Sequence, residues 1–116
     1  MNEYIKSLKD QGKLNISIDK TKTFNWKYDK IAGPCSVEGP EIIDIAKKIK
    51  SLGANAFRAG AYKPCTYPIL KETNGWKEGL REEGLRLLQQ VKEETNLPIV
   101  TEVMDASMVD EVGKVA

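Results

Sequence analysis

The sequence predicts an α/β fold, in which a parallel sheet is covered by helices and preceded by a short β-hairpin. Between residues 30 and 116, short apolar runs alternate three times with segments of helical periodicity. That order is typical of right-handed β-α-β crossovers in a parallel sheet. Before residue 30, two runs alternate apolar and polar residues around a polar turn, as the strands of a hairpin do. We therefore divide the chain into an N-terminal extension, residues 1–29, and an α/β domain, residues 30–116.

The extension is predicted to contain a short helix followed by the hairpin. In residues 1–10 the apolar side chains gather on one side of a helix, and Gly12 follows as a break. Residues 14–18 and 24–28 alternate apolar and polar side chains, with the polar turn 19–23 between them. We interpret this part of the chain as an appendage to the main fold.

The first unit of the α/β domain is a short strand that stops at Gly33 and Pro34, followed by a helix. Pro40 suits the first turn of that helix, where its missing N–H costs nothing, and Gly53 suits the end. Apolar residues at helical spacing predict its inward face: Ile42, Ile45, Ala46, Ile49 and Leu52.

The second unit begins with a strand over residues 55–61, whose small residues are typical of a crowded, buried strand. Residues 62–79 are polar and proline-rich, and we expect a loop there. A helix follows over residues 82–94 and is ended by Asn96 and Pro98.

The third unit is a strand over residues 98–104 and a last helix capped by Asp105 or Ser107. The apolar residues expected on that helix are Met108, Val109, Val112 and Val115. Three parallel strands leave two open sheet edges. The domain is therefore either a small three-layer module or the first part of a larger sheet or barrel.

Composition excludes several classes of function. A formal net charge of +1 over 116 residues gives no electrostatic case for nucleic-acid or membrane binding, and no apolar run is long enough to span a bilayer. The chain has no histidine, which excludes histidine-dependent catalytic triads and histidine metal sites within it. Two cysteines form neither a disulfide framework nor a zinc site, and the N-terminus lacks the apolar segment of a secretion signal, so we expect a cytoplasmic protein.

Candidate site residues follow the first two strands, because chemistry in parallel α/β folds lies at the carboxyl ends of strands. Arg58 and Lys63 would suit a phosphate or carboxylate ligand, although both are also common as surface cations. Arg58 lies in a small, apolar run, where a buried charge without a partner would be costly.

Cys35 comes directly after the first strand and is either a thiolate ligand for a divalent metal or a small buried apolar residue. Glu38, Glu102 and Asp105 also lie near predicted strand ends. Each has the chemistry of a metal ligand or a base, but we interpret all three first as helix N-terminal charges and caps.

Four segments resemble 3-deoxy-D-arabino-heptulosonate 7-phosphate (DAHP) synthases. Residues 31–39 read IAGPCSVEG and residues 57–64 read FRAGAYKP. Residues 79–85, GLREEGL, and residues 99–103, IVTEV, are similar to the segments that follow in that family. The resemblance extends from about residue 30 to the end of the chain, and its first two motifs in this order are specific.

The resemblance implies a TIM (β/α)8 barrel, of which this chain would form the first three βα units after its hairpin extension. It implies the condensation of phosphoenolpyruvate with erythrose 4-phosphate, the first step of the shikimate pathway, in a homo-oligomeric enzyme that uses a divalent metal such as Mn, Fe, Co or Zn. By position, Cys35 would be a metal ligand, and Arg58 and Lys63 would bind phosphoenolpyruvate. Lys63 would also assist proton transfer, and Thr66 would contact the sugar phosphate.

Two departures from the family pattern lead us to expect that this chain alone is inactive. Cys65 stands where the motif has an arginine, and the chain ends before the family's other metal ligands, a His, a Glu and an Asp. Two alternatives stay open at this point. One is the related 3-deoxy-D-manno-octulosonate 8-phosphate synthase, which uses a five-carbon sugar phosphate, and the other is a non-catalytic binding or regulatory fragment.

Overall fold

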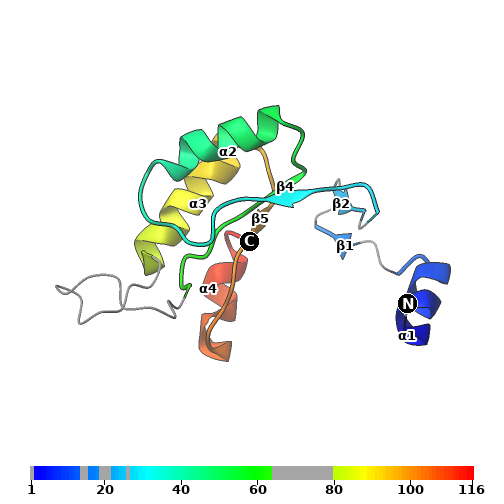
Figure 1. Ribbon diagram of the computed structural model, residues 1–116. Coiled ribbons are helices and arrows are strands. Elements are labelled where there is room, and N and C mark those ends of the chain that lie inside the picture. The colour runs from blue at the N-terminus through cyan, green and yellow to red at the C-terminus, as the bar shows by residue number, and fades with distance from the viewer. Residues whose placement is uncertain (1, 14–15, 19–21, 26, 64–79) are drawn as a thin grey trace. The chain divides into compact units, whose positions relative to one another are not determined.

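The structure is a computed structural model of the 116-residue chain (Figure 1). It describes residues 2–13, 16–18, 22–25, 27–63 and 80–116. The chain divides into two compact units, residues 1–30 and residues 31–116. Each unit is described by itself below.

The N-terminal unit contains the predicted helix and the predicted hairpin strands. Helix α1 (Glu3–Asp10) begins after Asn2, whose side-chain oxygen accepts the Tyr4 N–H at 2.7 Å. Strands β1 (Ile16–Ser17) and β2 (Thr23–Phe24) pair antiparallel. The antiparallel pair confirms the hairpin prediction for the described residues. Helix α1 buries none of its residues within this unit.

The larger unit contains a three-stranded parallel sheet in the order β3-β4-β5. Its strands are β3 (Ile31–Ala32), β4 (Ala56–Arg58) and β5 (Ile99–Val100). The parallel pairing confirms the predicted α/β class. The strands are shorter than predicted, because beyond Arg58 the β3–β4 pairing continues only as an isolated bridge between Ser36 and Gly60.

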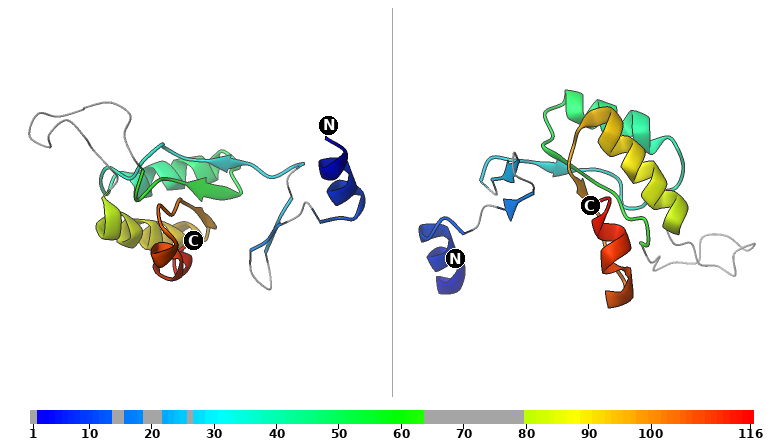
Figure 2. Two further views of the ribbon diagram at one scale, coloured as in Figure 1. Left: turned by 90° about the horizontal axis from the view of Figure 1, so that it is seen from below. Right: turned by 180° about the vertical axis from the view of Figure 1, so that it is seen from behind.

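The helical segments in the described part of this unit are α2 (Ile42–Ser51), α3 (Arg81–Thr95), the short 3₁₀ helix η2 (Ala106–Met108) and α4 (Val109–Gly113). Helices α2 and α3 lie side by side on one face of the sheet, and α4 lies next to α3 (Figures 1 and 2). The predicted helix ends are confirmed, since Gly53 follows α2 with φ of 98° and Asn96 ends α3 with φ of 57°. No helix in the described residues is long and apolar enough to cross a membrane.

The core lies between α2, α3 and the facing side of the sheet. Phe57 and Ile99 occupy neighbouring register positions on β4 and β5 and are both buried there. The helices contribute Ile42 and Ala46 from α2 and Leu85, Leu87, Leu88 and Val91 from α3.

Three residues predicted to face the core do not. Leu52 is 73% exposed because it forms the C-cap of α2, beyond the last turn that packs on α3. Ile45 is 37% exposed and Val109, the first residue of α4, is 50% exposed. The predicted helical spacing is right in each case, but only part of the apolar face of each helix is covered by neighbouring elements.

No helix among the residues that the structure describes covers the opposite face of the sheet. Ile31, Arg58 and Val100 share that face, since they alternate along their strands with the Ala32–Phe57–Ile99 row, of which Phe57 and Ile99 are buried. Ile31 is 49% exposed and Val100 is 37% exposed. Arg58 therefore leaves β4 on the side away from the helices, as a ligand-binding residue inside a barrel would.

Candidate active site at the carboxyl edge of the sheet

Cys35 lies beside the end of β4. Its carbonyl oxygen accepts the Gly60 N–H at 3.2 Å, and the Gly60 carbonyl accepts the Val37 N–H at 2.8 Å. These two bonds join the loop after β3 to the loop after β4 at the carboxyl edge of the sheet. The Cys35 thiol is free and exposed.

Gly33 brings the end of β3 against the backbone of Arg58. A Cβ atom on Gly33 would lie 1.8 Å from the Arg58 carbonyl oxygen, well inside van der Waals contact. Glycine is therefore required here for the close approach of two backbones. This approach fixes the position of Arg58 relative to the Cys35 loop.

Lys63 lies at the same carboxyl edge of the sheet as Cys35 and Arg58. Its Cβ lies 2.6 Å from the point where a Cβ on Gly60 would be, so the base of the lysine side chain folds over Gly60. The carboxylate oxygens of Glu102 lie 2.7 and 2.8 Å from that same point. The structure thus brings Cys35, Arg58 and Lys63 to one edge of the sheet.

Arg58 and Lys63 are half-buried and form no ion pair with any other described residue. Two cations that lose part of their hydration without gaining a counter-charge are costly in a folded protein. A small dianion bound between them would remove that cost, and guanidinium and ammonium groups are the usual donors to phosphate and carboxylate.

The described residues do not complete a metal site. Within residues 2–13, 16–18, 22–25, 27–63 and 80–116 there is no group of three Cys, Asp or Glu side chains placed to hold an ion. Cys35 lines a small pocket of about 200 Å³ with Glu38 and Glu41, but Glu38 accepts a hydrogen bond from the Ser36 hydroxyl at 3.3 Å. Cys35 alone provides one soft ligand of the several that a divalent transition metal requires.

The other predicted site residues have different outcomes. Thr66 and Cys65 lie outside the described residues. Asp105 is a cap, as interpreted, because its carboxylate accepts the Ser107 N–H at 2.8 Å, and hydrogen bonds from Ser107 lower the pKa of Asp105. The interpretation of Glu102 as a helix charge or cap is wrong: its carboxylate oxygen accepts the Tyr62 N–H at 3.0 Å, across the sheet edge.

Sequence reasoning missed the two glycines that bring the site together. Gly33 and Gly60 lie within the two motifs that contain Cys35, Arg58 and Lys63, and each stands next to a close backbone or side-chain contact. A glycine directly after a short buried strand is the available signal, since it often marks a close approach.

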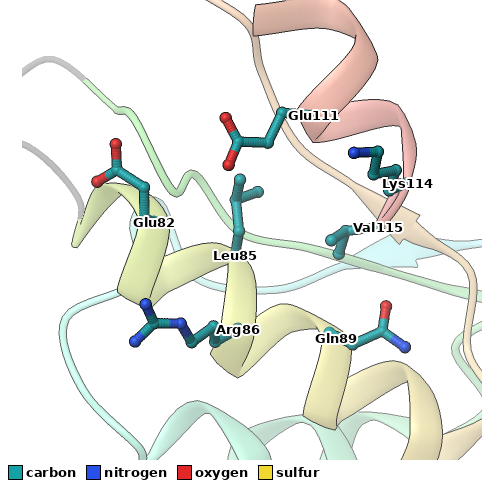
Figure 3. Close-up of a pocket in the computed structure, with 7 residues that line it drawn as sticks. All are labelled: Glu82, Leu85, Arg86, Gln89, Glu111, Lys114 and Val115. Atoms are coloured by element: carbon teal, nitrogen blue, oxygen red, sulfur yellow. The ribbon is translucent and has the colours of Figure 1, made fainter.

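A larger groove of about 510 Å³ lies elsewhere, between α3 and α4 (Figure 3). Its lining consists of Glu82, Leu85, Arg86, Gln89, Glu111, Lys114 and Val115. None of the predicted site residues that the structure describes lines it. Two of its carboxylates act on Tyr62: the pKa of Tyr62 is raised first by partial burial and then by the negative charges of Glu82 and Glu111.

The sequence matches the model of the DAHP synthetase I family over residues 14–116. The chain belongs to this family. The match covers both cysteines, all the predicted site residues and the whole of the parallel sheet.

Individual members of the family are similar at moderate identity. The chain is 36% identical over 102 residues to the phospho-2-dehydro-3-deoxyheptonate aldolase of Thermotoga maritima. This alignment covers 87% of this chain and 28% of that protein. It is 36% identical over 87 residues to a 2-dehydro-3-deoxyphosphooctonate aldolase of Leptothrix cholodnii, covering 73% of this chain and 30% of that protein.

The fold of the chain is also found within a solved family member. A crystal structure of the Thermotoga maritima enzyme, described as a DAHP synthase, superimposes with a TM-score of 0.68 at 33% identity over 88% of this chain. The chain spans only 28% of that structure and about a third or less of both relatives.

Proposed function

We propose that this chain forms the phosphoenolpyruvate-binding part of a DAHP synthase, 3-deoxy-7-phosphoheptulonate synthase. The reaction condenses phosphoenolpyruvate with erythrose 4-phosphate and releases inorganic phosphate, as the first step of aromatic amino acid biosynthesis. The chain would supply the first three βα units of a (β/α)8 barrel, which needs about 250 residues when complete. Membership of the family and the parallel order β3-β4-β5 support this assignment.

The observation that carries the proposal is the pair of half-buried cations at one sheet edge, neither of which forms an ion pair with another described residue. Arg58 would bind one anionic end of phosphoenolpyruvate through its planar fork, and Lys63 would neutralise the other as a compact charge. Lys63 is also our candidate for the group that holds a proton during condensation, and Thr66 for a contact to the sugar phosphate.

The family generally uses a divalent metal, and we propose Cys35 as one of its ligands. The metal would polarise the aldehyde as a Lewis acid when bound. Since the described residues supply no complete ligand set, the other ligands would come from outside them, and the chain alone is expected to be inactive.

Phosphoenolpyruvate binding by the ¹⁵N-labelled chain tests the site directly. We expect amide shift changes in residues 35–37 and 58–63, with Arg58→Leu and Lys63→Met each weakening binding roughly 10- to 150-fold, the value of one charge-assisted contact. Lys48→Met is the matched control, because it removes an exposed cation of α2 away from this edge. Shifts confined to other surfaces, or equal weakening by all three variants, would contradict the proposal.

A second candidate is 3-deoxy-8-phosphooctulonate synthase. The similarity to the Leptothrix cholodnii protein at 36% identity favours keeping it. Cys65, in place of the arginine of the DAHP synthase motif, would weaken the sugar-phosphate site and so leaves specificity open. Substrate use with four- and five-carbon sugar phosphates distinguishes the two enzymes, and a stable chain that binds neither phosphoenolpyruvate nor metal would instead indicate a non-catalytic fragment.

A further inference from the structure

The backbone turn that carries Lys63, residues 60–63, is bonded to three neighbouring segments. Gly60 is bonded to the loop after β3, as described above. The Ala61 carbonyl accepts the Arg81 N–H at 2.8 Å, which joins the turn to the start of α3. The Ala61 N–H donates to the Thr101 hydroxyl at 3.3 Å, and the Tyr62 N–H donates to Glu102 at 3.0 Å. We call residues 60–63 the Lys63 turn.

Glu102 is the one ionisable side chain, among the described residues, that is hydrogen-bonded to the backbone of the Lys63 turn. It is half-buried and reaches the turn from the residue that lies two positions beyond β5. An N–H donor bonded to a carboxylate forms a stronger bond than one bonded to a neutral oxygen. The Thr101 bond is both longer and neutral, so Glu102 provides the stronger tie from β5.

The Glu102 carboxylate and the base of the Lys63 side chain meet at Gly60. Both lie within 2.8 Å of the position that a Gly60 Cβ would take, and neither could stay there if position 60 carried a side chain. The carboxylate and the Lys63 Cβ therefore share the space that a side chain at position 60 would fill. The Tyr62 N–H that Glu102 accepts belongs to the residue directly before Lys63.

We propose that Glu102 is a positioning residue that holds the Lys63 turn, and through it the Lys63 ammonium, in place for the substrate anion. This inference rests on the proposed phosphoenolpyruvate site. Glu102 acts through the Tyr62 N–H and needs no contact with the substrate. What the role requires is an acceptor oxygen at this position, and the negative charge only strengthens the bond.

The test compares Glu102→Ala, which removes the acceptor, with Glu102→Gln, which keeps an acceptor oxygen and removes the charge. Asp110→Ala is the matched control, since it deletes an exposed carboxylate of α4. Two quantities are measured on the ¹⁵N-labelled chain: hydrogen exchange of the Tyr62 amide relative to the core amides of α3, and the Kd for phosphoenolpyruvate.

For Glu102→Ala we expect Tyr62 exchange to accelerate, and the Kd to rise, by roughly 10-fold or more, the value of one hydrogen bond to a charged group. Glu102→Gln should recover most of both losses, and Asp110→Ala should match the wild type. Unchanged Tyr62 exchange in Glu102→Ala would overturn the proposal, as would a Glu102→Gln variant that is as impaired as Glu102→Ala. If the wild-type chain binds no phosphoenolpyruvate, the proposed function fails on this chain, and Tyr62 exchange alone then decides whether Glu102 holds the turn.

Discussion

Replacing Gly33 by alanine should damage both the fold and the site, because no space exists for one methyl group. The new Cβ would lie 1.8 Å from the Arg58 carbonyl oxygen, 2.7 Å from its carbonyl carbon and 2.9 Å from its nitrogen. Real Cβ contacts are essentially never shorter than 3.0 Å, so the end of β3 must retreat from β4 by at least 1.2 Å, the difference between those two distances.

That retreat acts on the two bonds that join the Cys35 loop to Gly60, at 3.2 and 2.8 Å. Overpacking of a tight contact costs about 1–3 kcal/mol, and each weakened hydrogen bond about 0.5–1.5 kcal/mol. We therefore expect Gly33→Ala to lower the free energy of unfolding by about 2–6 kcal/mol. It should also weaken phosphoenolpyruvate binding, because the Cys35 loop after β3 moves away from Arg58 on β4.

Urea denaturation of Gly33→Ala and Gly113→Ala side by side measures this effect. Gly113 is the matched control, since it ends α4 and an alanine Cβ there would meet nothing within 4 Å beyond its chain neighbours and its own helix. The control should be as stable as the wild type or up to about 1 kcal/mol more stable, because a helix favours alanine over glycine. A Gly33→Ala variant that is as stable as the control would refute the close approach of β3 and β4 on which the site depends.

Two further predictions concern the helical layer. Thr95→Val should lower the free energy of unfolding by about 1–3 kcal/mol in urea denaturation, because the buried Thr95 hydroxyl accepts the Leu97 N–H at 3.2 Å and that donor would be left unpaired; an unchanged midpoint would contradict this. The Lys47–Glu94 ion pair, at 2.8 Å, should contribute stability at neutral pH that is lost on acidification, because the hydrogen bond from Lys47 lowers the pKa of Glu94. A carboxylate whose pKa is lowered in the folded protein contributes its full stabilisation at pH values above its ordinary pKa. That contribution is lost as the pH falls through the lowered pKa of the folded state. In the Glu94→Gln variant, the free energy of unfolding should therefore fall less steeply on acidification than in the wild type. An unchanged pH dependence would contradict a stabilising Lys47–Glu94 ion pair.

The fold class was predictable because each signal for it is local. Period-2 alternation marked the hairpin, and helical spacing with Gly53 and Asn96 marked where α2 and α3 end. How far the apolar stripe of a helix is covered depends on neighbours distant in sequence. Leu52 and Val109 were therefore placed on the correct helices but wrongly assigned to the core.

The candidate site was only partly predictable. Arg58, Lys63 and Cys35 follow strand ends, and parallel strands direct their carboxyl ends to one edge, so their proximity follows from the fold class. The contact of Glu102 with the Lys63 turn does not follow from it. That contact depends on the register of β4 with β5 and on the conformation of the Glu102 side chain. Neither can be predicted from the spacing of apolar and polar residues.

The most direct test of the central claim is the condensation rate of a chimera, in which residues 14–116 of this chain replace the matching segment of the Thermotoga maritima enzyme. We predict that this chimera releases phosphate from phosphoenolpyruvate only when erythrose 4-phosphate is present. Lys63→Met should abolish that release, and Cys65→Arg should lower the KM for the sugar phosphate. A folded chimera that lacks condensation activity, or that keeps full activity without Lys63, would contradict the account.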